Sequence, residues 1–465
     1  MIEIEDFNNP QVKKLPNHLR QYIVSQNYHH YTPVDHAVWR YVMRQNYSYL
    51  KDVAYYPYIK GLSRAGLSIE YIPDLQTMND NLAKIGWGAV TVDGFIPPVA
   101  FMEFQAYQVL VIAADIRQIN HIAYTPAPDI IHESAGHAPI IADEAYNKYL
   151  SYFGSIGAKA MFSSKDYELY EAIRHLSILK EDANSSAKAI EKAEQKVAYC
   201  QENLGEPSEM ALLSRLHWYT VEYGLIGTLE NPKIYGAGLL SSIGESVSCM
   251  QPNVKKLWYN LDTVNYSYDI TKTQPQLFVT PNFENLIEVL EAFADTMSFR
   301  KGGAEGILKA IECKKACTAV YSSGLQVTGV FTTLGLNDHD ELEFIKTSEP
   351  SALSFENKQL EKHGKNVHQD GFSSPVGKLK NTNKPLEDFS NQELQKINIE
   401  IGKNTLIEFE SGIILKGEVT NIIRKKEKII LISWQNCTVK TAEDEILFDP
   451  SWGVYDMAVG EKVIS

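Results

Sequence analysis

Cysteine is scarce in this sequence, and long apolar runs are missing from it. Five cysteines in 465 residues are too few for a disulfide scaffold. The longest apolar stretches, such as residues 108–114, are far too short to cross a bilayer. The amino-terminal residues are acidic and lack the apolar segment of a secretion signal. These absences argue against a small disulfide-bonded domain and a membrane-spanning protein, and they predict a cytoplasmic location.

Positive charge is also in deficit. The chain carries 44 Lys and Arg against 58 Asp and Glu, a formal net charge of -14. Because affinity for nucleic acids depends mainly on basic side chains, this balance argues against nucleic-acid binding as the main function. Hydrophobic residues make up 44% and charged residues 22%, which is ordinary for globular proteins and excludes a disordered or collagen-like chain. The length predicts about three domains, or one large domain and a smaller one.

Residues 1–311 are predicted to form one mostly helical domain with short β elements. Apolar residues recur at helical spacing over 34–50, and the apolar run over 101–119 also predicts a helix. A short helix is predicted over 127–138, where Pro139 stops its continuation, and another from the N-cap residue Asp143 to Tyr152. Residues 163–206 are rich in Glu, Lys, Ala and Gln with one narrow apolar stripe, which predicts a helical insertion.

The sequence changes character after residue 311. Residues 312–402 are predicted to be a connector, partly of low complexity, because Asn, Lys, Ser, Asp and Glu dominate much of this range. Residues 403–465 contain short β-branched runs joined by turns, which predict a small β-rich module. The predicted fold class is therefore a mainly α domain with short β elements, followed by a small β-rich carboxy-terminal module.

Two histidines and a glutamate, His132, Glu133 and His137, lie within six residues. Zinc proteases place two histidine ligands four residues apart on one helix face. The spacing here is five, which sets the two imidazoles about 140° apart around an ideal α-helix. Both can bind one metal ion only if the helix ends or distorts between them, and Gly136 and Pro139 favour such a change.

Glu222 is the best candidate for a third ligand. It is the lone acid in an aromatic and β-branched segment, so we expect it to be buried, and a buried carboxylate requires a partner. Two imidazoles and one carboxylate with open coordination positions are typical of non-haem Fe(II) sites that activate oxygen. The alternative is a hydrolase in which the same three side chains hold zinc.

Three sequence segments occur in a characteristic order. They are Pro-Asp-x-x-His-Glu-x-x-Gly-His-x-Pro at 128–139, Trp-Tyr-Thr-Val-Glu-Tyr-Gly at 218–224, and Tyr-Gly-Ala-Gly-Leu-Leu-Ser-Ser-x-Gly-Glu at 235–245. Through them the sequence resembles the pterin-dependent aromatic amino acid hydroxylases, and among these the bacterial members that hydroxylate phenylalanine. The resemblance extends from about Tyr31 to Met297 and implies this family's catalytic fold for residues 1–311. We therefore expect no regulatory domain ahead of the catalytic part.

The resemblance implies roles for the matching positions. His132, His137 and Glu222 would bind Fe(II). The substrate amino acid would contact a second group of residues: Arg117, Thr125, Trp218, Tyr223, Gly238 and Ser241. The tetrahydropterin would contact a third group: Gly94, Ile96, Pro98, Phe101 and Glu133. These roles suit the side chains, because a guanidinium can bind a carboxylate through two parallel hydrogen bonds and a phenyl ring can stack on a flat heterocycle.

The implied reaction converts L-phenylalanine, dioxygen and a tetrahydropterin into tyrosine and a hydroxylated pterin. Ile270 matches a position that helps to distinguish substrates, and an aliphatic side chain there offers no polar partner to a phenol. Phenylalanine is therefore the expected substrate and tryptophan the alternative. The pterin is either tetrahydrobiopterin or a bacterial tetrahydropterin, because the loop from Pro97 to Ala100 differs from the animal members. His217 also stands where the family usually carries tyrosine. The sequence leaves the oligomeric state open.

Overall fold

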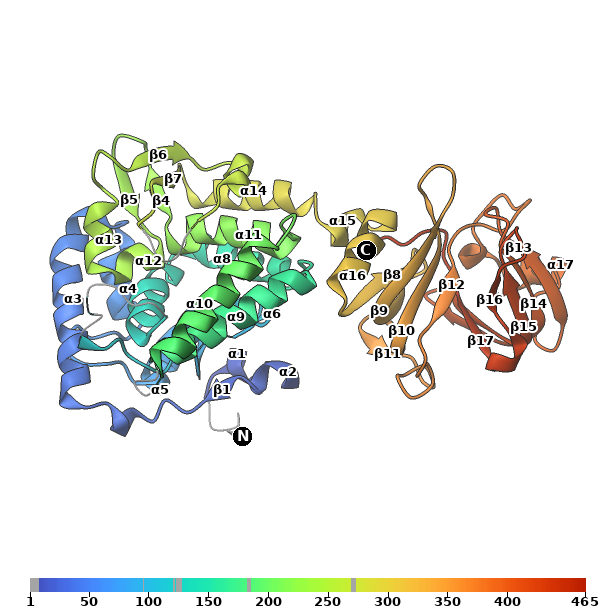
Figure 1. The fold of residues 1–465 in the computed structure, drawn as a ribbon, viewed down its shortest axis with the longest axis horizontal. Helices are drawn as coiled ribbons and strands as arrows, with labels where there is room; N and C mark the ends of the chain where they lie inside the picture. Colours follow the sequence, from blue (N-terminus) through green and yellow to red (C-terminus); the bar gives the residue numbers. More distant parts are fainter. Residues whose placement is uncertain (1–7, 95, 120–121, 123–127, 182–184, 269–272) are drawn as a thin grey trace. The chain divides into compact units, whose positions relative to one another are not determined.

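The computed structural model describes residues 8–94, 96–119, 122, 128–181, 185–268 and 273–465. The chain divides into two compact units, residues 1–294 and residues 295–465 (Figure 1). The first unit is mainly helical and contains a three-stranded and a four-stranded sheet, whereas the second contains two five-stranded antiparallel sheets. A mainly α part followed by β structure is the predicted class, although the β structure is more extensive than predicted.

Two helices that were predicted in the first unit are present, and a capping residue precedes each of them. Helix α3 (Pro33–Val53) starts after Thr32, whose side chain accepts a hydrogen bond from the Asp35 amide in a capping box. Helix α8 (Glu144–Gly157) starts after Asp143, whose carboxylate accepts hydrogen bonds from two amides of the first turn. It runs five residues beyond the predicted end at Tyr152. Further helices of this unit are α1 (Pro10–Lys13), α2 (Asn17–Arg20), α4 (Pro57–Arg64), α5 (Leu75–Leu82) and α14 (Phe283–Ala294).

The single helix predicted over 101–119 is wrong. The structure has α6 (Pro98–Ala106), a turn through Gln108 at φ 59°, and then strand β3 (Val109–Ala113). Strand β3 pairs in parallel with β2 (Gly88–Val92), which pairs antiparallel with β1 (Ile23–Val24). Every residue of β3 is buried. A strand buried on both faces reads as a continuous apolar run, and periodicity alone does not distinguish such a run from a buried helix.

The predicted helical insertion at 163–206 contains two helices, α9 (Ser164–Glu181) and α10 (Ala187–Glu202). They lie side by side (Figure 1), and an ion pair between Lys180 and Glu194 at 2.9 Å links them. The chain then continues into α11 (Glu209–His217). The second sheet of this unit has the order β5-β4-β7-β6 and consists of β5 (Pro232–Ile234), β4 (Leu225–Gly227), β7 (Gln276–Thr280) and β6 (Lys255–Trp258).

The second unit begins with helices α15 (Ser298–Lys301) and α16 (Gly303–Cys313). Its first sheet has the order β11-β10-β9-β8, with β12 also paired to β10: β8 (Ala316–Val320), β9 (Leu325–Leu336), β10 (Leu342–Phe355), β11 (Lys358–Gln359) and β12 (Ser373–Pro375). Helix α17 (Asn391–Lys396) precedes the second sheet, whose order is β13-β14-β15-β16, with β17 also paired to β15. Its strands are β13 (Asn404–Glu408), β14 (Ile414–Lys425), β15 (Lys428–Lys440), β16 (Ile446–Phe448) and β17 (Tyr455–Ala458).

The domain boundaries predicted in this part of the chain differ from the structure. The units divide between 294 and 295 rather than at 311, and the supposed connector 312–402 contains strands β8 to β12. In β9 the first seven residues alternate between buried and half-buried positions. An antiparallel strand with one face toward solvent needs apolar side chains only at alternate positions. A segment can therefore be rich in polar residues and still belong to a folded sheet. Among the described residues, no helix is both long and apolar enough to span a membrane.

Candidate functional site

His132 and His137 lie on one turn of π-helix, η5 (Ile131–His137). The hydrogen bonds of a π-helix link residues five apart, so this helix returns residue i+5 to the same face as residue i. This is the distortion that the five-residue spacing requires. Pro139 was predicted to end the helix. Instead it lies in the first turn of the helix that follows, α7 (Ala138–Ile141). Gly136 has a different part: a Cβ there would lie 2.7 Å from the carbonyl oxygen of Ala237, so only glycine permits this contact.

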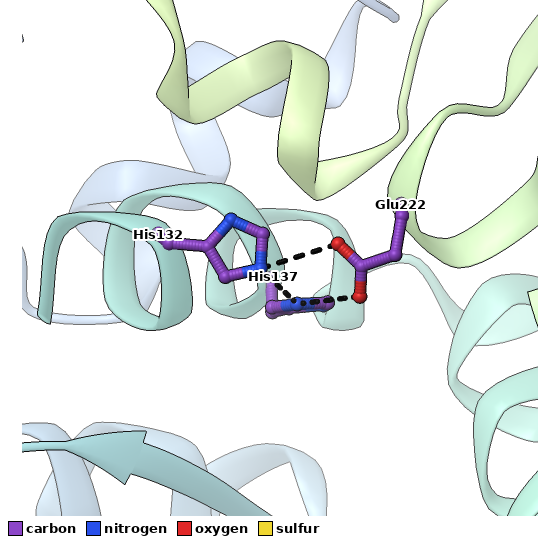
Figure 2. A group of neighbouring side chains, drawn as sticks. All are labelled: His132, His137 and Glu222. Atoms are coloured by element: carbon purple, nitrogen blue, oxygen red, sulfur yellow. Dashed lines mark hydrogen bonds and ion pairs between the residues drawn. The ribbon is translucent and has the colours of Figure 1, made fainter. Parts of the chain in front are cut away.

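Glu222 reaches the two histidines from a second π-helix, η6 (Trp218–Glu222), which continues α11. Figure 2 shows the three side chains pointing toward one another. The Nε2 atoms of His132 and His137 are 3.3 Å apart, and the Glu222 carboxylate oxygens lie 3.2 and 3.3 Å from them. Ligand atoms bound to one ion at about 2.0–2.2 Å lie roughly 3–3.6 Å apart. The three donor atoms are therefore spaced as the ligands of a single metal ion are.

The electrostatics of these three side chains favour a cation between them. Burial raises the pKa of Glu222, but the two imidazoles outweigh burial and hold its pKa well below the usual range. Burial lowers the pKa of His132, yet the Glu222 carboxylate outweighs this effect and raises the pKa to about 9. A buried carboxylate that attracts protons to the neighbouring imidazoles would equally attract a metal cation. The donor set and its charge thus fit a divalent metal such as Fe(II).

Ser241 orients the first histidine. It ends helix α12 (Ala237–Ser241), and its hydroxyl donates to the Ala237 carbonyl at 2.8 Å. The same oxygen lies 3.0 Å from Nδ1 of His132, where it can accept a hydrogen bond. A proton on Nδ1 leaves Nε2, the atom that faces Glu222, with its lone pair available for a metal. Ser241 was predicted to contact the substrate, and in the structure its side chain contacts His132.

Arg117 makes a buried ion pair with Asp129. Its Nε and Nη2 atoms each donate to the Asp129 carboxylate at 2.8 Å, and its backbone amide donates at 3.0 Å. A further hydrogen bond runs from Nη1 to the Ser241 carbonyl at 3.3 Å. Burial raises the pKa of Asp129, but the guanidinium outweighs burial and lowers it. One edge of the guanidinium is therefore held by Asp129, and Arg117 still lines the cavity beside the histidines.

The aromatic residues predicted to wall the substrate site form a stack. Trp218 lies between Tyr223 and Tyr268, with ring centroids 4.5 Å from each. The Tyr223 hydroxyl donates to Glu245 of helix α13 (Ile243–Ser248), which holds that ring in place. A Cβ at Gly238 would lie 2.9 Å from the Tyr223 ring, so the close approach predicted there is present. Sequence reasoning missed Tyr268, because only the fold brings residue 268 back beside residue 218.

The residues predicted to contact the pterin line the same cavity, which has a volume of about 360 Å³. They are Gly94, Ile96, Pro98, Phe101 and Glu133. Within the described part of the chain, the Oε2 atom of Glu133 is buried without a hydrogen-bond partner, and burial raises the pKa of this carboxyl. Nε2 of His137 lies 3.7 Å from this oxygen, which is too far for a hydrogen bond, so the oxygen can still accept one from a ligand. The N–H groups of a pterin ring can donate such a hydrogen bond, so these residues fit the cofactor that the resemblance implies.

His217 fills a further place beside the site. Its Nδ1 lies 3.9 Å from the Glu222 carboxylate, and its ring meets the edges of Phe101 and Phe153. Burial lowers the pKa of His217 to about 4, so its imidazole is neutral at pH 7. Tyr170 of α9 also lines the cavity, which places a side chain from the helical insertion at the site. The sequence did not predict this contact, because Tyr170 lies in an amphipathic, charge-rich segment without a recognisable site motif. Thr125 and Ile270 lie outside the described residues.

Comparisons with known proteins show which family this chain resembles. The family model of the biopterin-dependent aromatic amino acid hydroxylases matches residues 21–191 and 193–301. The phenylalanine-4-hydroxylase of Ralstonia nicotianae is 28% identical over 283 residues, which cover 58% of this chain and 76% of that protein. The phenylalanine-4-hydroxylase of Pseudomonas aeruginosa is 27% identical over 277 residues, which cover 58% of this chain and 88% of that protein.

The phenylalanine hydroxylase of Chromobacterium violaceum, with bound iron(III) and the oxidised cofactor 7,8-dihydrobiopterin, aligns with a TM-score of 0.47 and 24% identity. The alignment covers 60% of this chain and 92% of that one. The family model alone spans more than half of the chain, and its matched ranges include His132, His137 and Glu222. The chain therefore belongs to the biopterin-dependent aromatic amino acid hydroxylases.

Proposed function

We propose that this protein is a monooxygenase that uses Fe(II) and a tetrahydropterin to hydroxylate the ring of L-phenylalanine, giving tyrosine. The observation that carries the proposal is that three predicted groups meet at one cavity. They are the metal-ligand triad, of which His132 and Glu222 line the cavity, an arginine with an aromatic stack, and the pterin-facing residues. The names of the related phenylalanine-4-hydroxylases support phenylalanine as the substrate. One oxygen atom of O2 enters the ring and the other enters the pterin, which supplies the two electrons.

In this proposal His132, His137 and Glu222 hold the iron, which together with the pterin activates oxygen when bound. Ser241 keeps Nε2 of His132 directed at the metal position. Three protein ligands leave the remaining coordination positions open for small molecules. The protein's contribution is thus to fix the ligand geometry and to bring ring, pterin and oxygen together in a largely apolar cavity.

Arg117 and the aromatic stack position the amino acid. The guanidinium lines the cavity with one edge held by Asp129, so it is already oriented before a carboxylate arrives. The substrate's carboxylate binds to this side chain, and its ring packs against the wall formed by Trp218, Tyr223 and Gly238. The pterin is assigned to the part of the cavity that Phe101 and Glu133 line, with its ring on Phe101 and an N–H group donating to Glu133.

The first test is a product assay. The Fe(II)-loaded protein is supplied with oxygen, a tetrahydropterin and, separately, phenylalanine, tryptophan or tyrosine. We expect tyrosine to form only when phenylalanine, pterin and Fe(II) are all present, and we expect less product from tryptophan. Zn(II) replaces Fe(II) in a matched control and should give no product. A protein with iron bound that hydroxylates none of the three amino acids would contradict the proposal.

Glu133→Gln tests the pterin side of the cavity. A hydrogen bond to a charged acceptor contributes about 1.5–3 kcal/mol. We therefore expect the KM for tetrahydropterin to rise roughly tenfold or more, because the amide accepts more weakly than the carboxylate. Steady-state rates at varied pterin, together with the iron content, measure this effect. Glu144→Gln, at an exposed pair with Lys148, is the control. An unchanged KM in a variant with normal iron content would remove Glu133 from the pterin site.

A further inference from the structure

A second cluster of two histidines and an acid lies in the second unit. His363 and His368 lie between β11 and β12, and Asp456 lies on β17. Only 9% of the His363 side chain, 10% of the His368 side chain and 7% of the Asp456 side chain are exposed. The two histidines are five residues apart, the same spacing as in the triad, but here on irregular chain rather than on a π-helix. The active-site proposal uses none of these residues.

The donor atoms of this cluster converge. Nδ1 of His363 lies 3.3 Å from the Oδ2 atom of Asp456, and Nε2 of His368 lies 3.6 Å from the same oxygen. One donor atom from each residue falls within 4.8 Å of the other two. A tetrahedral zinc ion with bonds of about 2.0–2.2 Å separates its ligands by roughly 3.3–3.6 Å. Both measured separations fall in that interval.

Both imidazole nitrogens lack another partner. Among the described residues, neither Nδ1 of His363 nor Nε2 of His368 makes a hydrogen bond, although both face Asp456. Both nitrogens face the same Asp456 oxygen, at 3.3 and 3.6 Å, and buried nitrogens without a well-formed hydrogen bond are uncommon in folded proteins. A metal ion among the three side chains satisfies both nitrogens and the carboxylate oxygen together.

The surroundings hold the three side chains in place. The Oδ1 atom of Asp456 accepts a hydrogen bond from the Ser433 hydroxyl at 2.5 Å, across the paired strands β15 and β17. This bond leaves Oδ2 directed at the histidines. The backbone carbonyl of His368 accepts from the Ser351 amide at 2.9 Å, and its ring meets the edge of Phe372. Carboxylate ligands of metal sites are commonly oriented by such neighbouring hydrogen bonds.

We propose that His363, His368 and Asp456 form a second metal site, which binds a divalent first-row transition ion such as Zn(II). Two imidazoles and a carboxylate with one open position form a donor set that zinc accepts, and zinc binds nitrogen and oxygen ligands more tightly than iron or manganese does. An ion here ties the segment between β11 and β12 to strand β17, so it stabilises the second unit. The proposal is independent of the hydroxylase function.

The test uses the full chain with the active-site ligands removed, as the variant His132→Ala/His137→Ala, freed of metal and titrated with Zn(II). We expect one equivalent of zinc to bind per chain. Adding Asp456→Asn should weaken that binding by more than about 100-fold, since even residues that only orient a ligand affect affinity by roughly 10–100-fold. Adding instead His339→Gln, at an exposed histidine in the second unit, should leave the single equivalent unchanged.

A folded His132→Ala/His137→Ala protein that binds no zinc would overturn the proposal. The same holds if adding Asp456→Asn to that protein leaves its zinc affinity unchanged. Circular dichroism checks that each variant is folded. If a variant does not fold, the metal content of the unsubstituted chain decides the question instead. Two equivalents of zinc per chain and a rise in the thermal midpoint of the second unit are then expected, and a single equivalent contradicts the second site.

Discussion

His137→Ala is expected to abolish both iron retention and hydroxylation. The imidazole lies 3.3 Å from both His132 and Glu222, so its loss removes one of three protein ligands and leaves the Glu222 carboxylate with less neutralising charge. Replacing a residue that merely orients a ligand costs about 10–100-fold in metal affinity or activity, so loss of the ligand itself should exceed 100-fold. Metal analysis after gel filtration and the tyrosine-forming assay measure the two effects.

The control for this variant is His175→Ala, at an exposed position on α9. It should keep full iron content and full activity, because its imidazole is exposed to solvent and is not among the residues that line the cavity. Equal iron content in His137→Ala and the control, with equal activity, would exclude His137 from the metal site. Loss of activity with full iron retained would instead assign it another role in the cavity.

Arg117→Ala is expected to reduce the use of phenylalanine and to destabilise the first unit. Loss of a charge-assisted hydrogen bond to the substrate's carboxylate, worth about 1.5–3 kcal/mol, raises the KM for phenylalanine roughly 10–100-fold. The same change leaves the carboxylate of Asp129 buried without its cation, which costs about 3–5 kcal/mol. Iron content should change far less than KM. Kinetics at varied phenylalanine, iron analysis and thermal unfolding separate these effects.

The ion pair between Arg117 and Asp129 should make the stability of the fold fall at acidic pH. Because Arg117 holds the pKa of Asp129 below its ordinary value, the pair stabilises the fold at neutral pH. That contribution is lost as the pH falls through the lowered pKa, and it is absent from Arg117→Ala throughout. Arg44→Ala, which breaks an exposed pair with Glu70, is the control and should change neither KM nor stability appreciably. Equal losses of iron and of phenylalanine binding in Arg117→Ala would contradict the carboxylate-binding role.

Part of the site could be predicted because it is encoded locally. The five-residue spacing of His132 and His137 is incompatible with a shared face on an α-helix, so a distortion had to be present, and the π-helix η5 is that distortion. Asp143 marked the start of α8 because capping depends on a side chain and the amides next to it. The resemblance supplied the remaining site residues, which the described structure gathers around one cavity, Thr125 excepted.

Other features depend on packing between distant segments. Periodicity did not show that the apolar run of β3 is a strand, because burial on both faces removes the alternation. It did not reveal the sheet of β8 to β12 either, because solvent on one face permits polar residues at every second position. Likewise, Tyr268 beside Trp218, and Asp456 beside His363 and His368, meet only through tertiary contacts.

The sequence by itself thus determined the class of the first unit, the start of α8 and the chemistry of the candidate metal ligands, since each rests on neighbouring residues. Only the tertiary structure decided the partner of Arg117, the aromatic stack, the strands of the second unit and its buried histidine pair. These depend on which distant side chains exclude water together, and residue spacing along the chain does not carry that information.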